Sequence, residues 1–291
     1  MHLIEKDNEI LPMVMIDAHV HIYSCFDLQI FFDSAFNNFK SEAAKNGHPD
    51  NFRAIVMLTD WAAENWFKYL ADYAGGENYT KGKIVKNWTF HKTNESCSLY
   101  AKHYKGGGLY VIAGRKIITK ENLEVLALIT ETNFKDGLSL NKTILNIHDK
   151  DSIPVIPWAF GKWIGKRGKI LMDLIKVTKK PEYLFCDNSN RPYFWPRPSL
   201  FRLGELKGIR VIAGSDPLHF ASEVFRVGSF GFSFNGSISS KKPASDMKKY
   251  LLDSRIQFQV YGKLEKPCRF LCNQMVMQIN KKKWRQELTN I

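Results

Sequence analysis

The chain has 291 residues, of which 44% are hydrophobic and 24% are charged, an ordinary composition for a globular protein. No apolar run approaches the 18 residues of a membrane span, and the five cysteines contain no Cys-x-x-Cys pair. We therefore expect reduced thiols in a cytoplasmic protein without a membrane-spanning segment. The net charge of +13 permits nucleic-acid or phosphate partners, although a lysine-rich solvated surface is the simpler explanation.

The first predicted element is an apolar strand over residues 14–21, which ends in a His-x-His pair. Residues two apart on a strand project to the same face, so Asp17, His19 and His21 are expected to share one side. Two imidazoles placed in this way can hold zinc, manganese or iron. The spacing also arises by chance, but its position at a strand end favours a metal site.

The rest of the chain alternates between strand-like and helix-like segments. Further strands are predicted at 53–59, 109–113, 155–158, 183–186 and 210–214, and helices at 26–46, 65–73, 139–148, 167–177, 243–253 and 267–280. Residues 83–101 indicate a β-hairpin, residues 123–128 fit a strand or a helix, and residues 228–240 form a Gly/Ser-rich loop. This alternation predicts an α/β fold: a TIM-like (β/α) barrel, regular or distorted, with seven or eight strands and the hairpin inserted, as a single domain over residues 1–291.

Polar side chains follow almost every predicted strand. In a βα barrel the chemistry lies where the strands end, so these residues predict a shared polar rim. They are Asp17, His19, His21, Asp60, Arg115, Lys162, Asp187, Asp216 and His219.

Two of these strand ends carry a recognisable pattern. Asp17-Ala-His19-Val-His21 resembles the opening motif of metal-dependent hydrolases, both the amidohydrolase superfamily and the PHP (polymerase and histidinol phosphatase) domain. Ala213-Gly-Ser-Asp216-Pro-Leu-His219 is similar to the late Gly-Ser-Asp-x-His motif of PHP domains, whose aspartate binds metal. The segment 114–128 is weakly similar to the PHP segment after its third strand.

The resemblance implies a hydrolytic metal centre, with departures in the middle strands. PHP domains carry further histidines and a glutamate there, whereas this chain ends one such strand in Trp158 and another in Arg115-Lys116. We therefore expect one divalent metal ion (zinc, manganese or iron), held by His19, His21 and Asp216.

Further roles are assigned to charged residues of the predicted rim. Asp187 and Asp216 are the candidate catalytic carboxylates, with Asp187 moving a proton of the water or, alternatively, capping its own loop. Arg115, Lys162 and Arg191 are candidates for an anion pocket, to which His219 is added as a substrate contact. Alternatively, Lys162 begins the solvated basic run and Arg191 pairs with a surface acid.

The favoured function is a metal-dependent hydrolase that acts on a phosphoester through a metal-activated water. An amidohydrolase-type enzyme that cleaves a C–N or lactone bond is one alternative, and a degenerate, non-catalytic barrel that binds an anionic ligand is another. The expected partner is a small, anionic substrate. Nucleic acid is not expected, because the basic run 162–180 is interrupted by apolar residues at helical spacing.

Overall fold

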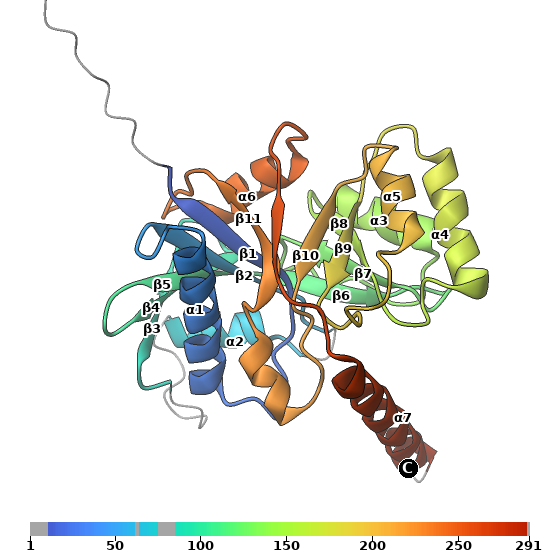
Figure 1. Cartoon of the computed structure of the whole chain (residues 1–291), viewed down its shortest axis with the longest axis horizontal. Coiled ribbons are helices and arrows are strands. Elements are labelled where there is room, and N and C mark those ends of the chain that lie inside the picture. Colours follow the sequence, from blue (N-terminus) through green and yellow to red (C-terminus); the bar gives the residue numbers. More distant parts are fainter. Residues whose placement is uncertain (1–10, 62–63, 75–84, 290–291) are drawn as a thin grey trace, which may run out of the picture.

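The computed structural model describes residues 11–61, 64–74 and 85–289, which form two β-sheets and the helices around them (Figure 1). The strands are β1 (Met13–Val20), β2 (Phe52–Leu58), β3 (Trp88–Lys92), β4 (Ser98–His103), β5 (Gly108–Ile112), β6 (Gly114–Ile118), β7 (Glu124–Leu128), β8 (Ile153–Pro157), β9 (Leu184–Asn188), β10 (Val211–Gly214), β11 (Phe230–Asn235) and β12 (Gln259–Gly262). The helices are α1 (Leu28–Lys45), α2 (Trp66–Ala74), α3 (Leu140–Asp149), α4 (Gly165–Val177), α5 (Ser199–Glu205), α6 (Pro243–Leu252) and α7 (Pro267–Thr289), with a 3-10 helix, η1 (Ala221–Arg226).

The strands pair in a seven-stranded sheet with the order β12-β11-β1-β2-β5-β4-β3 and a five-stranded sheet with the order β10-β9-β8-β7-β6. Both sheets are mixed. In the first, β1 and β2 are parallel while β11 runs antiparallel to β1. In the second, β8, β9 and β10 are parallel, whereas β7 runs antiparallel to both of its neighbours, β6 and β8.

The TIM-like barrel predicted from the sequence is therefore wrong. Its premise was that every strand is parallel and is followed by a helix. Instead β6 and β7 form a hairpin, β3, β4 and β5 follow one another antiparallel, and the strands belong to two sheets that do not close into one barrel. The hairpin expected within residues 83–101 is present as β3 and β4, at the edge of the first sheet, while residues 83–84 lie outside the described part.

Three strands were not predicted, namely β6, β11 and β12, and the first two begin at or beside glycines. Residues 228–240 were expected to be loop, yet β11 lies there and pairs with β1. Its phenylalanines alternate with small residues, and Gly231 is required because a Cβ there would lie 2.0 Å from the Ile16 carbonyl oxygen. β6 begins at Gly114, where the expected strand 109–113 ends.

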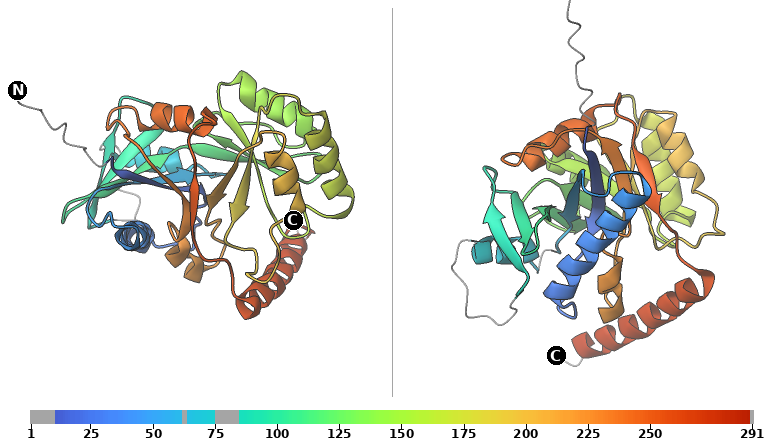
Figure 2. Two further views of the ribbon diagram at one scale, coloured as in Figure 1. Left: turned by 45° about the horizontal axis from the view of Figure 1, so that its top comes forward. Right: turned by 60° about the vertical axis from the view of Figure 1, so that its left-hand side comes forward.

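Apolar side chains fill three clusters that define the layers. A central cluster lies between the sheets and includes Ile16, Leu126 and Cys186. A second cluster packs α1 and α2 on the outer face of the first sheet, and a third packs α3, α4 and α5 on the outer face of the second. Figure 2 shows α1 and the α3–α5 group on opposite sides of the molecule.

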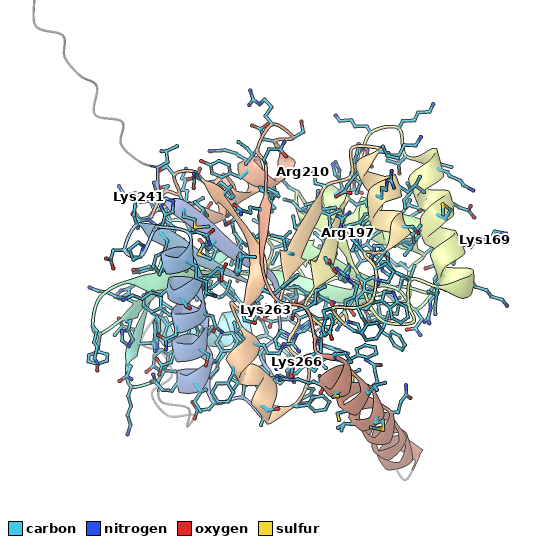
Figure 3. All side chains as sticks on the ribbon, viewed as in Figure 1. Lys169, Arg197, Arg210, Lys241, Lys263 and Lys266 are labelled. Carbon is cyan, nitrogen blue, oxygen red and sulfur yellow. The ribbon has the colours of Figure 1, made fainter. Side chains whose placement is uncertain are left out.

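The positive charge is spread over this architecture. In Figure 3, Lys241, Lys169 and Lys266 lie on widely separated parts of the surface. Within the described part of the chain, no helix combines the length and the apolar character needed to cross a membrane. The single-domain organisation expected for residues 1–291 stays a prediction.

Candidate metal centre

A β-bulge in β1 decides which side chains of the His-x-His motif face the space between the sheets. The register with β2 shifts between Asp17 and Val20. Before the shift, Ile16 and Ala18 face the central cluster; after it, Val20 packs with the outer cluster. The extra residue reverses the alternation, so His19 and His21 point inward while Asp17 points outward. The expectation that all three share one side is therefore wrong for Asp17.

Asp17 instead accepts hydrogen bonds from the backbone of two other segments. Its buried carboxylate accepts hydrogen bonds from the N–H groups of Ser215 at 2.7 Å and Gly228 at 2.8 Å. Burial raises the pKa of Asp17 to about 6, against the opposing effect of these hydrogen bonds. Asp17 thus joins β1 to the segments that follow β10 and η1, and so fixes the position of the neighbouring Asp216.

His19, His21 and Glu124 converge at the end of β1, with their ligand atoms all within 4.8 Å of one another. The Nε2 atoms of the two histidines are 3.1 Å apart, and Glu124 Oε1 lies 3.4 Å from His19 Nε2. All three side chains are buried. Asp216 completes the group, because its Oδ1 lies 3.4 Å from His19 Nε2 and 3.6 Å from His21 Nε2.

These distances fit a metal ion. Two ligands bound about 2.1 Å from a tetrahedral ion lie about 3.4 Å apart, close to the separations of His19 from Glu124 and of both histidines from Asp216. Burial, together with the charges of Lys116 and His19, holds the pKa of His21 well below its ordinary value, so its imidazole is neutral. Neutral imidazole and carboxylate form a donor set suited to zinc, manganese or iron.

Hydrogen bonds orient the candidate ligands. The Thr59 hydroxyl lies 3.1 Å from the Val20 carbonyl oxygen and 3.2 Å from His21 Nδ1. If it donates to the carbonyl, it accepts from Nδ1–H, which leaves the Nε2 lone pair of His21 facing the cluster. On the other side, Asn188 Nδ2 donates to Asp216 Oδ2 at 2.8 Å, which leaves Oδ1 directed at the histidines.

Two lysines stand beside Glu124. Lys116 Nζ lies 3.1 Å and Lys162 Nζ 3.2 Å from Glu124 Oε2, while the other oxygen faces His19. Burial raises the pKa of Glu124, but the charges of Lys116 and Lys162 outweigh it and hold that pKa well below its ordinary value. Glu124 is therefore an ionised carboxylate with one oxygen shared by the two lysines and the other directed at His19.

The structure arranges the expected anion pocket differently. Lys162 lies at the cluster, whereas Arg115 is on the opposite face of β6 from Lys116 and points towards Asp60, with Nη1 3.8 Å from its carboxylate. Arg191 binds Asp187 at 2.7 Å and donates to the Trp195 carbonyl at 2.8 Å. Neither arginine joins Lys162.

Asp187, expected to be catalytic, is likewise not brought to the cluster. Along β9, Leu184 and Cys186 face the central cluster while Phe185 faces the outer one. By the same alternation Asn188 points inward and Asp187 outward, where Arg191 contacts both carboxylate oxygens. His219 stacks on Tyr23 with ring centroids 4.4 Å apart, and Tyr23 neighbours His21 with a centroid separation of 5.6 Å, so His219 lies near the rim of the cluster.

Sequence reasoning missed Glu124, Lys116 and Asn188. Glu124 begins the buried strand β7, and it is the one acid in a strand whose other four residues are apolar. A carboxylate at the start of such a strand was the signal that could have marked Glu124 as a site residue. Asn188 follows Asp187 directly on β9, so the two could have been distinguished only by knowing which face of the sheet each one points to.

Comparison with known proteins gives the fold. The chain shares its fold with PsfC. The crystal structure of PsfC from Pseudomonas syringae superposes on this chain with a TM-score of 0.53 at 14% sequence identity, and the match covers 96% of this chain and 100% of PsfC. No family model matches the sequence, and no curated protein matches it significantly.

Two further solved structures are similar at lower scores. One is the lesion-specific endonuclease PfuEndoQ from Pyrococcus furiosus, with a TM-score of 0.44, 12% identity and coverage of 85% of this chain and 57% of that one. The other is a two-domain protein from Bacteroides vulgatus containing a predicted PHP-like metal-dependent phosphoesterase, with a TM-score of 0.40, 11% identity and coverage of 87% and 65%. At such scores these similarities carry no argument about the chemistry of this chain, which rests on its own residues.

Proposed function

We propose that this protein is a metal-dependent hydrolase that acts on a phosphoester. The observation that carries the proposal is the convergence of His19, His21 and Glu124 within 4.8 Å at the end of β1, with Asp216 beside them. The PHP-like motifs around His19 and Asp216 support the same conclusion, because they are the segments that meet here. The single-ion site is thereby extended to include Glu124.

His19, His21, Glu124 and Asp216 would hold the ion. A bound divalent ion supplies a lowered water pKa and polarises the phosphoryl group. The chain's own residues supply binding and orientation. Asn188 and Asn190 both donate to Asp216 Oδ2, at 2.8 and 3.2 Å, and keep the other oxygen directed at the cluster.

Lys116 and Lys162 are proposed to bind the phosphoryl oxygens. Their ammonium groups share one carboxylate oxygen, so they provide two positive charges against one negative charge beside the cluster. The Lys162 side chain is 26% exposed, which lets it reach an incoming phosphate. A neutral amide or lactone would have no need of this pair.

The test of metal binding uses the full chain, loaded with zinc, manganese or iron and freed of excess ion. Elemental analysis should find metal in the wild type and its loss in His21→Ala. The matched control is His91→Ala, which removes an exposed imidazole from β3 and should leave the metal content unchanged. Equal metal content in all three proteins would contradict the site.

The test of substrate class compares phosphatase activity of Lys162→Ala with that of Lys169→Ala, an exposed lysine on α4 (Figure 3). We expect kcat/KM of Lys162→Ala to fall about tenfold, the scale of one charged hydrogen bond, and the control to match the wild type. Unchanged phosphoester turnover in Lys162→Ala would favour the C–N or lactone alternative.

The non-catalytic alternative has one observation in its favour. Lys116 and Lys162 already surround one oxygen of Glu124, as cations would in a site that has dispensed with metal. A wild-type protein that takes up none of the three metals but binds inorganic phosphate would establish this alternative over the hydrolase.

A further inference from the structure

A second candidate site lies at the other end of the first sheet. A cavity of about 850 Å³ opens where β2 and β5 begin, in the size range of small-molecule sites. In the parallel pairing, Arg53 of its wall is level with Val14, five residues before His19. At about 3.3 Å per strand residue, the wall lies roughly 17 Å from the metal centre along β1.

The cavity is strongly basic. Its walls contain five basic side chains against one acid, Asp50; the basic residues are Lys40, Arg53, His91, Lys92 and Lys105. Among the described residues, none of the lysines in this wall nor Arg53 forms an ion pair, and Arg53 makes only a long contact, 3.4 Å, to the carbonyl of its neighbour Phe52. The cavity wall thus carries four lysine and arginine side chains against one carboxylate, and no ion pair among the described residues offsets this surplus. We name this cavity the basic pocket.

Aromatic rings line the same cavity. Tyr100 and Tyr110 contact each other with centroids 5.1 Å apart, and Phe36 and Phe52 lie together at 6.0 Å. The position of Tyr100 depends on Gly108, because a Cβ there would lie 2.7 Å from the tyrosine hydroxyl. Burial raises the pKa of both tyrosines, whose hydroxyls are neutral at physiological pH and able to donate.

The walls come from five different segments that the fold brings together. Lys40 lies on α1, Arg53 on β2, Lys92 on β3 and Lys105 on the turn between β4 and β5, while Ile238 and Ser240 come from the segment before α6. A basic surface that merely keeps the protein soluble needs no cavity and no aromatic wall. Charge, rings and volume together describe a ligand that carries several negative charges and one flat ring.

We propose that the basic pocket binds a nucleoside polyphosphate, with its phosphates on Arg53 and the lysines and its base against the tyrosines. Guanidinium and ammonium groups are the usual partners of phosphate oxygens, and the exposed mouth admits a charged ligand. The site is independent of the proposed hydrolysis, because it shares no residue with the metal centre.

The test is isothermal titration of the full chain with ADP, in EDTA so that no ion bridges the phosphates to the metal centre. We expect ADP to bind, and adenosine and pyrophosphate each to bind at least tenfold more weakly. Arg53→Ala, which changes an exposed side chain, should weaken ADP binding about tenfold or more. Lys45→Ala, an exposed lysine of α1 outside the pocket, should bind as the wild type does.

A second variant, His21→Ala, separates the two sites and should bind ADP normally whatever its metal content. The proposal is overturned if ADP does not bind at millimolar concentration, if Arg53→Ala and Lys92→Ala both bind it normally, or if His21→Ala abolishes binding. Binding of a single-stranded oligonucleotide without ADP binding would also overturn it, in favour of a nucleic-acid surface.

Discussion

Replacing Glu124 by glutamine removes one charge from a buried cluster and keeps the shape of the side chain. In the wild type the carboxylate is paired with Lys116 at 3.1 Å and Lys162 at 3.2 Å. The Glu124 side chain is 7% exposed and that of Lys116 is 10% exposed, whereas Lys162 can turn towards water. The substitution therefore leaves one ammonium group, that of Lys116, buried without a counter-charge.

The size of the effect follows from this burial. Removing one partner of a fully buried ion pair costs about 3–5 kcal/mol. Because Lys162 can rehydrate and the glutamine oxygen can still accept a hydrogen bond, we expect about 2–3 kcal/mol for Glu124→Gln. The assay is urea unfolding of metal-free protein at neutral pH, with the free energy of unfolding extrapolated to water.

Glu205→Gln is the matched control. Glu205 pairs with Arg197 through two hydrogen bonds of 2.6 and 2.8 Å, but both side chains are more than 40% exposed. An exposed pair contributes about 0–1 kcal/mol. Combining Glu124→Gln with Lys116→Met should recover part of the lost stability, because the stranded charge is then gone. Equal destabilisation by Glu124→Gln and Glu205→Gln would refute the reasoning.

Two further predictions concern Asp60 and Arg191. Burial raises the pKa of Asp60 to about 6 from 3.8, so its stabilising contribution is complete below pH 4 and is lost as the pH rises through 6. The isosteric Asp60→Asn variant should avoid that loss, and the change in unfolding free energy between pH 4.5 and pH 7.5 should favour it by about 2 kcal/mol; parallel pH dependences for the two proteins would contradict this. Arg191→Lys should lower the free energy of unfolding by about 1–3 kcal/mol, because the buried two-point contact with Asp187 is lost. The same variant should leave kcat/KM for a phosphoester unchanged. A fall in kcat/KM without a fall in stability would return Arg191 to the substrate site.

The sequence predicted the elements better than their pairing. Runs such as 109–113 and 155–158 are apolar throughout, so their composition alone marks them as buried strands. Whether neighbours run parallel or antiparallel depends on turns such as the one between β6 and β7, which the pattern of apolar residues does not encode. The barrel prediction failed at that point.

The same limit explains which site residues were found. The structure brings together His19, His21 and Asp216, because β1 and β10 end beside each other as the motifs implied. Glu124 was overlooked because it begins a strand. Since β7 runs antiparallel to β8, its start lies at the edge where the parallel strands β8, β9 and β10 end, whereas only residues at the ends of strands were considered as site residues.

Asp187 was misplaced for a different reason: the sequence does not show which residues of β9 face the space between the sheets. Strand position alone placed it on the rim, but neighbouring residues of a strand face opposite ways. Fixing the phase of β9 required knowing that Cys186 and not Phe185 faces the space between the sheets. Both are apolar and both are fully buried, so composition does not distinguish the two faces.

The bulge in β1 makes the metal centre sensitive to chain length rather than to residue type. One surplus residue between Asp17 and Val20 turns the imidazoles inward and leaves the Asp17 carboxylate free to secure Ser215 and Gly228. A deletion of one residue there would send both histidines towards α1 with every ligand still present in the sequence. Among distant proteins of this architecture, a retained His-x-His pair therefore indicates an inward-facing metal centre only when the number of strand residues that precede the pair is retained too.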